Sequence, residues 1–196
     1  LASVGLHRIS FGVEHGNEEF RKKYLIRDFK NKDIIEKLKI PHQYGVQFSV
    51  NNITGFPYET RELATDTIEL NRLIDSDNQN IYAFVPFHGT PLRKVTEKLG
   101  YVKHTDITRC LTDRPMLDQP QYSADEVAGL QRCFVLYVGM PKNRWKEIQK
   151  AEKNTPEGDR IFEKLKDEYK AEYLKPELSS SKDKSFKVAD LEYGLN

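Results

Sequence analysis

The feature that most constrains the fold is an alternation of short strand-like and helix-like segments over the first hundred residues. Arg8 to Val13 and Val46 to Ile53 alternate apolar and polar side chains, and Asn80 to Phe87 is apolar and aromatic. Each predicted strand is followed by a segment with helical character. This pattern is typical of βα units, in which right-handed crossovers place the strands side by side and parallel. The sequence therefore predicts an α/β fold with three adjacent parallel strands in chain order and helices on one side.

The rest of the chain has a different pattern, which indicates a helical extension. Residues 101–122 contain two prolines and no sustained period, so we predict an irregular connector there. A capping-box sequence begins at Ser123, and Thr155-Pro156 is a second helix start. We expect the βα units over residues 1–100, the connector and helices over 101–178, and a weakly structured tail over 179–196.

Charge and hydropathy argue against several classes of protein. The chain has 31 basic and 30 acidic residues and a formal net charge of +1, so it lacks the basic footprint that nucleic acid or anionic lipid requires. It has no apolar run of about 20 residues and no leader peptide pattern. We expect a cytoplasmic protein without a membrane span or a nucleic-acid partner. Leu1 to Leu6 resembles the end of a helix already begun, so we expect that upstream sequence is missing.

Ligands in parallel βα folds gather where strands end, because free backbone groups and helix N-termini meet there. Glu14 follows the first predicted strand and is well placed to accept hydrogen bonds from a ribose diol; the alternative is a solvated loop glutamate. His15 and His88 also lie at strand ends. They could act in acid–base chemistry or bind a substrate, although such histidines more often only hydrogen-bond within their loop. Gly55 and Gly89 indicate tight exits where backbone can approach a ligand.

Other candidate residues have simpler expected roles. The alternation along the second strand predicts that Ser49 and Asn51 face the concave side of the sheet and give it a polar lining. The aromatic residues of the third strand are expected to be core rather than a stacking platform. They are Tyr82, Phe84 and Phe87. The two cysteines, Cys110 and Cys133, are too few for a disulfide scaffold and are expected to be buried thiols.

Together, the three strand ends resemble the second half of the radical S-adenosylmethionine (SAM) domain. Arg8 to Gly16 resembles the family's fourth strand, Gly45 to Thr60 its fifth and Phe84 to Pro91 its sixth, in matching order and spacing. The Gly-Phe-Pro-Tyr-Glu-Thr exit and the Gly-Thr-Pro turn within these segments are similar to the cobalamin-binding branch, which includes the anaerobic magnesium-protoporphyrin ester cyclases. Thr108 to Tyr173 resembles the helical tail of that branch.

The resemblance implies the C-terminal half of a partial (β/α)6 TIM-like barrel with an α-helical extension. In this family SAM binds a 4Fe-4S cluster and is cleaved reductively to a radical that starts methyl transfer, cyclisation or related chemistry. The resemblance implies that Glu14 holds the ribose hydroxyls and that Arg27 reaches the methionine carboxylate. Ser49 and Asn51 are counted with the cofactor-binding residues. The adenine would be flanked by Gly55 and by the backbone of Val85, Pro86 and Phe87.

One departure from the family pattern is decisive. The chain has no cysteine triad, and Cys110 and Cys133 lie beyond the barrel strands, so it cannot ligate the cluster in the family's way. We therefore expect a fragment, inactive by itself, whose cluster ligands lie in the upstream part of the same polypeptide. A cobalamin domain would also lie upstream. The alternative is a degenerate, cluster-free half-barrel that acts as a binding or interaction domain. In either case the sequence leaves the small-molecule substrate unidentified.

Overall fold

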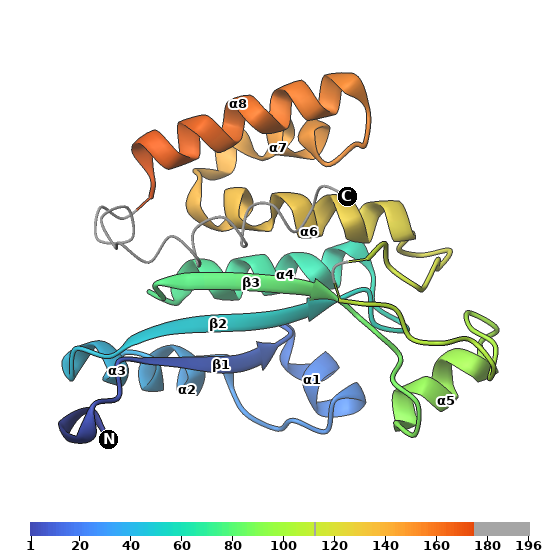
Figure 1. The fold of residues 1–196 in the computed structure, drawn as a ribbon, viewed down its shortest axis with the longest axis horizontal. Helices are drawn as coiled ribbons and strands as arrows, with labels where there is room; N and C mark the ends of the chain where they lie inside the picture. Colours follow the sequence, from blue (N-terminus) through green and yellow to red (C-terminus); the bar gives the residue numbers. More distant parts are fainter. Residues whose placement is uncertain (112, 175–196) are drawn as a thin grey trace.

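The computed structural model describes residues 1–111 and 113–174, which form a three-stranded parallel sheet with helices (Figure 1). The strands β1 (Arg8–Glu14), β2 (Gln47–Thr54) and β3 (Asn78–Ala83) lie in the order β1-β2-β3. Both neighbouring pairs are parallel. The helices are η1 (Ala2–Val4), α1 (Glu18–Tyr24), α2 (Asn31–Lys37), α3 (Ile40–Gln43), α4 (Arg61–Leu73), α5 (Pro91–Lys98), α6 (Ala124–Gly139), η2 (Lys142–Arg144), α7 (Trp145–Ala151) and α8 (Pro156–Glu172). The predicted strand order and direction are confirmed.

One face of the sheet is apolar and packs on α2 and α4, which lie behind the strands in Figure 1. Its β2 side chains, Phe48 and Val50, are almost fully buried. Alternation then turns the next side chains to the opposite face, as predicted. There the hydroxyls of Ser10 and Ser49 lie 2.7 Å apart, and the Asn80 amide donates to Asn51 Oδ1 at 3.1 Å. This face therefore has the expected polar lining.

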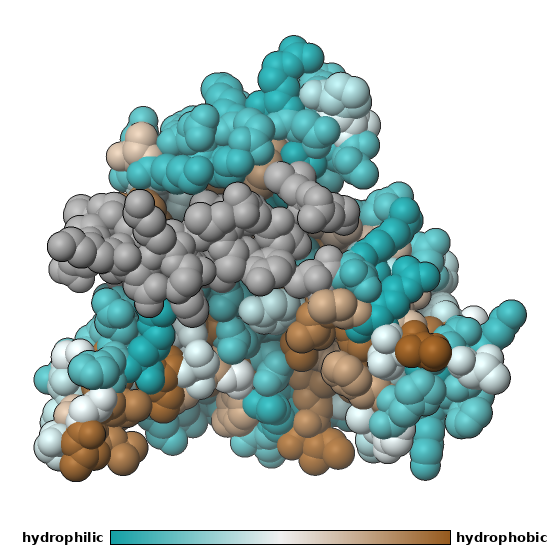
Figure 2. Space-filling view, viewed as in Figure 1, coloured by the Kyte–Doolittle hydropathy of each residue, from teal (hydrophilic) through white to brown (hydrophobic). Residues whose placement is uncertain are grey.

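Figure 2 shows the molecule from this second side, with apolar side chains gathered at two places. One patch lies beside η1, where Leu1 and Val4 are exposed, and the other lies near the carboxyl ends of the strands. Polar side chains separate the two patches. The strand ends thus combine apolar surface with the polar groups described below.

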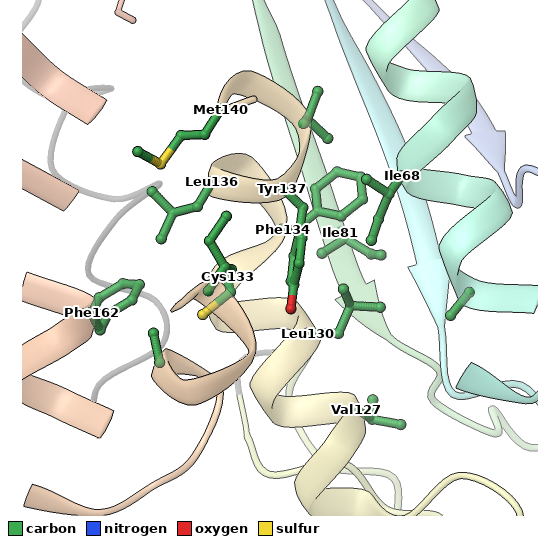
Figure 3. Close-up of a cluster of buried hydrophobic side chains, with 14 of the residues drawn as sticks. Ile68, Ile81, Val127, Leu130, Cys133, Phe134, Leu136, Tyr137, Met140 and Phe162 are labelled. Carbon is green, nitrogen blue, oxygen red and sulfur yellow. The ribbon is translucent and has the colours of Figure 1, made fainter. Parts of the chain in front are cut away.

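The largest core lies around α6, which packs on both β3 and α4 (Figure 3). Phe134 points toward Ile68 and Ile81, while Leu136 and Cys133 lie on the side of Phe162 from α8. The capping box at the start of α6 and the Thr155 cap of α8 are both present. The helical region therefore shares its core with α4 and β3. The domain boundaries stay a prediction, and residues 179–196 lie outside the described part.

The third strand ends earlier than predicted, at Ala83 instead of Phe87. The Phe84 amide still donates to Thr54 O at 2.8 Å, but the Phe87 amide donates to Val85 O at 2.9 Å, which turns the chain away from the sheet. Phe87 is 51 % exposed, so its assignment to the core is wrong, whereas Phe84 is buried as expected. An apolar run cannot distinguish the last residues of a buried strand from the loop that follows it.

Two further expectations differ from the structure, namely that Asn31, as a typical N-cap residue type, caps the helix that follows it and that Cys110 is buried. Lys30 is the N-cap of α2 and Asn31 is its first helical residue, because the Asn31 side chain binds Gly16 O and Arg21 instead of the helix amides. Cys110 is exposed, since it lies in the irregular connector, where its amide donates to Asp113. Cys133 is buried as expected. Within the described residues, no helix combines the length and apolar character needed to cross a bilayer.

Candidate cofactor site at the carboxyl ends of the strands

Glu14 and Arg27, predicted separately, lie together at the end of β1. Arg27 Nη2 lies 3.2 Å from Glu14 Oε1, and Arg27 Nη1 donates to Gly12 O at 3.1 Å. A side chain at Gly12 would overlap the Glu14 carboxylate, so the carboxylate lies directly over this glycine. The register of β1 against β2 also shifts between Gly12 and Glu14. The end of β1 therefore places one carboxylate and one guanidinium at the rim of the sheet.

The environment of Glu14 is unusual for a solvated loop glutamate. Its side chain is 19 % exposed, against 42 % for that of Arg27. Loss of solvent raises the pKa of Glu14, and the positive charge of Arg27 offsets only part of this effect. The Glu14 backbone has φ 70°, a conformation that costs a non-glycine residue about 1 kcal/mol or more. Glu14 is therefore more buried than a solvated loop glutamate would be, and its part in binding a cofactor stays a prediction.

The exit of β2 contains a buried carboxylate that the sequence analysis did not single out. Glu59 is fully buried, and its Oε2 accepts hydrogen bonds from the amides of Gly55 at 2.5 Å and Phe56 at 2.9 Å. Its Oε1 accepts from Thr54 Oγ1 at 3.3 Å. Gly55 has φ 81°, and an added Cβ would lie 3.1 Å from Val127, so the predicted tight exit is present. The sequence signal for Glu59 was an acid shortly after a Gly-Phe-Pro turn.

His15 completes the environment of Glu59. Its Nδ1 accepts from the Asn17 amide at 3.0 Å, so Nε2 carries the hydrogen and donates to Glu59 Oε1 at 3.2 Å. The ring is fully buried and stacks on Phe20 with 4.3 Å between ring centroids. By contrast, His88 is exposed and lies 3.1 Å from Asp106 O. Both histidines are hydrogen-bonded, but Glu59 and Asp106 lie outside the histidines' own loops, and a role of either histidine in binding or catalysis stays a prediction.

The loop after β3 is held by a buried arginine. Arg93 of α5 is 2 % exposed and donates from Nη1 to Pro86 O at 3.1 Å. Its Nη2 also contacts three carbonyl oxygens of the connector, those of Lys103, His104 and Asp106. Val85 is buried, and Phe87 extends into solvent. The Phe87 amide already donates to Val85 O, so it is not available to a ligand. This loop can therefore contact a ligand more readily through its apolar side chains.

Ser49 and Asn51 lie on the polar face below the rim. Ser49 is buried against Ser10, and Asn51 bonds with Asn80. Asn51 is the nearer of the two to the carboxyl end of β2. Both side chains therefore lie on the polar face of the sheet, before the strand ends that carry Glu14 and Gly55. Their part in binding a cofactor stays a prediction.

The charged groups at the rim have the chemistry expected of a SAM site, which stays a prediction, and they do not fit an iron-sulfur cluster. A carboxylate and a guanidinium match the ribose diol and the carboxylate of SAM. For the cluster, the described residues bring together no three His, Cys, Asp or Glu side chains that could hold a metal ion. Of the two cysteines in the sequence, Cys110 lies in the connector and Cys133 lies on the buried side of α6.

Comparisons with known proteins find relatives that share part of this chain. A tRNA-2-methylthio-N(6)-dimethylallyladenosine synthase from Halalkalibacterium halodurans is 32 % identical over 99 residues, which are 48 % of this chain and 18 % of that protein. The threonylcarbamoyladenosine tRNA methylthiotransferase of Xenopus laevis is 32 % identical over 85 residues, 43 % of this chain and 15 % of that protein. An uncharacterized methyltransferase of Pyrococcus horikoshii is 22 % identical over 145 residues, 74 % of this chain and 31 % of that protein.

No family model matches the chain. The tRNA methylthiotransferases among its relatives are enzymes of the radical SAM superfamily. In each of the three relatives described above, the match spans less than a third of that protein's length, with 31 % as the largest share. The chain is therefore similar to one segment of radical SAM enzymes.

Proposed function

We propose that this chain is the C-terminal half of the barrel of a radical SAM enzyme and supplies part of its SAM and substrate site. The observation that carries the proposal is the Glu14–Arg27 pair at the end of β1, beside the Gly55 exit of β2. The similarity to segments of radical SAM methylthiotransferases supports it. When bound to its cluster, SAM would supply the radical chemistry, and this chain would orient it and exclude water.

Each rim residue has a distinct role in this proposal. The Glu14 carboxylate accepts the ribose hydroxyls, and Arg27 binds the methionine carboxylate of SAM. Gly55 leaves room for close approach of the adenine, with Val85, Pro86 and Phe87 on its other side. The ion pair of Glu14 with Arg27 keeps both side chains at the rim until the neutral ribose diol replaces Arg27 as the partner of Glu14 and the carboxylate of SAM replaces Glu14 as the partner of Arg27.

The remaining parts of the proposal concern segments outside this chain. The cluster ligands would be a cysteine triad in a preceding segment of the same polypeptide, and the chain alone would be inactive. A cobalamin domain stays a prediction from the sequence, and the names of the relatives lend it no support. The expectation of no nucleic-acid partner also stays a prediction, and relatives named for tRNA modification weigh against it. A start codon just before Leu1 would favour the cluster-free binding domain instead.

The test is Glu14→Gln in the longer polypeptide with a reconstituted cluster. Removing the charge should weaken SAM binding by about 1.5 to 3 kcal/mol, which is on the order of ten- to a hundredfold in Kd. Iron content should not change, since the cluster ligands lie elsewhere. Unchanged SAM affinity would remove Glu14 from the site, and loss of iron would mean that the substitution had damaged the fold.

A further inference from the structure

Glu14 and the Gly55 loop would contact opposite ends of one nucleoside, so their relative position must be fixed. The main-chain ladder is irregular at this point: Glu14, the last residue of β1, still pairs with Asn52, but the register of β1 against β2 shifts between Gly12 and Glu14. Glu14 also has φ 70°, which the chain would relax if its neighbours allowed it. Side-chain contacts therefore help to hold the two exits together.

The buried pair of His15 and Glu59 joins the two exits by a hydrogen bond, beside the ring contact of Phe20 with Phe56. On one side, the Glu59 carboxylate accepts hydrogen bonds from two amides of the β2 exit, those of Gly55 and Phe56. On the other side, it accepts from His15 Nε2 at 3.2 Å, and His15 is the residue that follows Glu14. Both side chains have no exposed surface, so water cannot replace this hydrogen bond.

His15 is held at every polar atom. Its amide donates to Val13 O at 2.9 Å, which closes a tight turn around Glu14, and its carbonyl accepts from Arg21 Nη1 at 2.6 Å. Its ring bonds to the Asn17 amide through Nδ1 and to Glu59 through Nε2. A shift of the ring would therefore move the peptide that carries the Glu14 carboxylate.

We infer that His15 is a positioning residue, which through Glu59 sets the place of the Glu14 carboxylate relative to the Gly55 loop and so tunes SAM affinity. This inference rests on the proposed function. His15 does not touch the cofactor in this arrangement, since its ring is buried between Phe20 and Glu59. Its effect on SAM binding should therefore depend on the presence of the Glu14 charge.

Two substitutions separate hydrogen bonding from packing. His15→Gln keeps an N–H donor near the place of Nε2, whereas His15→Phe keeps a ring that can stack on Phe20 and removes the donor. SAM affinity would be measured by equilibrium dialysis in the longer polypeptide with its cluster, beside iron content and the unfolding midpoint. We expect His15→Phe to weaken binding about tenfold and His15→Gln to remain within about threefold of the parent.

A double-mutant cycle tests whether His15 acts through Glu14. In the Glu14→Gln background, His15→Phe should weaken binding by less than about threefold, because the charge that it positions is gone. His42→Ala is the matched control, since His42 Nε2 lies 2.9 Å from Asp77 Oδ2 near the amino end of β2, and it should leave SAM affinity unchanged.

Each other outcome overturns a stated part of the argument. Equal losses in both backgrounds, a larger loss for His15→Gln than for His15→Phe, or loss of fold and iron in both variants would reduce the pair to a fold-determining contact. Failure of the parent polypeptide to bind SAM would instead refute the proposed function.

Discussion

Replacing Glu59 with glutamine should destabilise the chain by about 2 to 4 kcal/mol. The carboxylate faces donors on both sides, with the amides of Gly55 and Phe56 at Oε2 and with His15 Nε2 and Thr54 Oγ1 at Oε1. A glutamine side chain must turn its NH2 group toward one of these two sets. Either orientation places donors against donors in a fully buried site.

The less costly orientation turns the NH2 group toward His15 and Thr54. The Thr54 hydroxyl can then donate to the Tyr122 hydroxyl, which lies 3.2 Å away, but the His15 Nε2–H loses its acceptor. The His15 tautomer cannot change without loss of the bond from the Asn17 amide. One lost bond to a charged group costs about 1.5 to 3 kcal/mol, and a buried donor left unpaired costs about 1 to 3 kcal/mol, with part of the two costs shared.

Urea unfolding of the purified chain, followed by circular dichroism, measures this loss as a lower midpoint at an unchanged m-value. The control is Glu36→Gln, an exposed glutamate on α2, which should change the free energy of unfolding by less than about 0.5 kcal/mol. A loss below about 1 kcal/mol for Glu59→Gln would refute the reasoning, since it would mean that these four donors do not depend on the carboxylate.

Two further predictions concern the strand exits and the cysteines. Gly16→Ala should destabilise the chain by about 2 kcal/mol or more in thermal or urea unfolding, because its Cβ would overlap the backbone of Asp66 on α4. Gly89→Ala, where φ is 83° and the space is open, should cost only about 1 to 2 kcal/mol. Equal losses of stability at the two sites would contradict the packing argument. A thiol reagent should modify Cys110 quickly and Cys133 only as the protein unfolds, because burial raises the pKa of the Cys133 thiol; two equally fast reactions would show that the core under α6 is open.

The sequence by itself determined the strands, their parallel order and the faces that they present. Period-two alternation assigns Phe48 and Val50 to one face and Ser49 and Asn51 to the other, and these assignments depend only on local geometry. Helix caps are equally local, so the Ser123 and Thr155 starts were predictable. The position of Glu14 at a strand end followed from the same pattern.

Only the tertiary structure decided which of these rim residues meet. His15 and Glu59 are 44 residues apart, and the connector carbonyls that Arg93 binds follow it by 10 to 13 residues. Such pairs depend on the crossing of loops above the sheet, which no periodic pattern encodes. The misplaced end of β3 and the exposure of Cys110 have a more local cause, because an apolar run does not distinguish the end of a strand from the turn that follows it, and a single cysteine in an irregular segment has no pattern that marks its burial. A buried polar group is recognised only when the structure places its donors and acceptor within hydrogen-bonding distance.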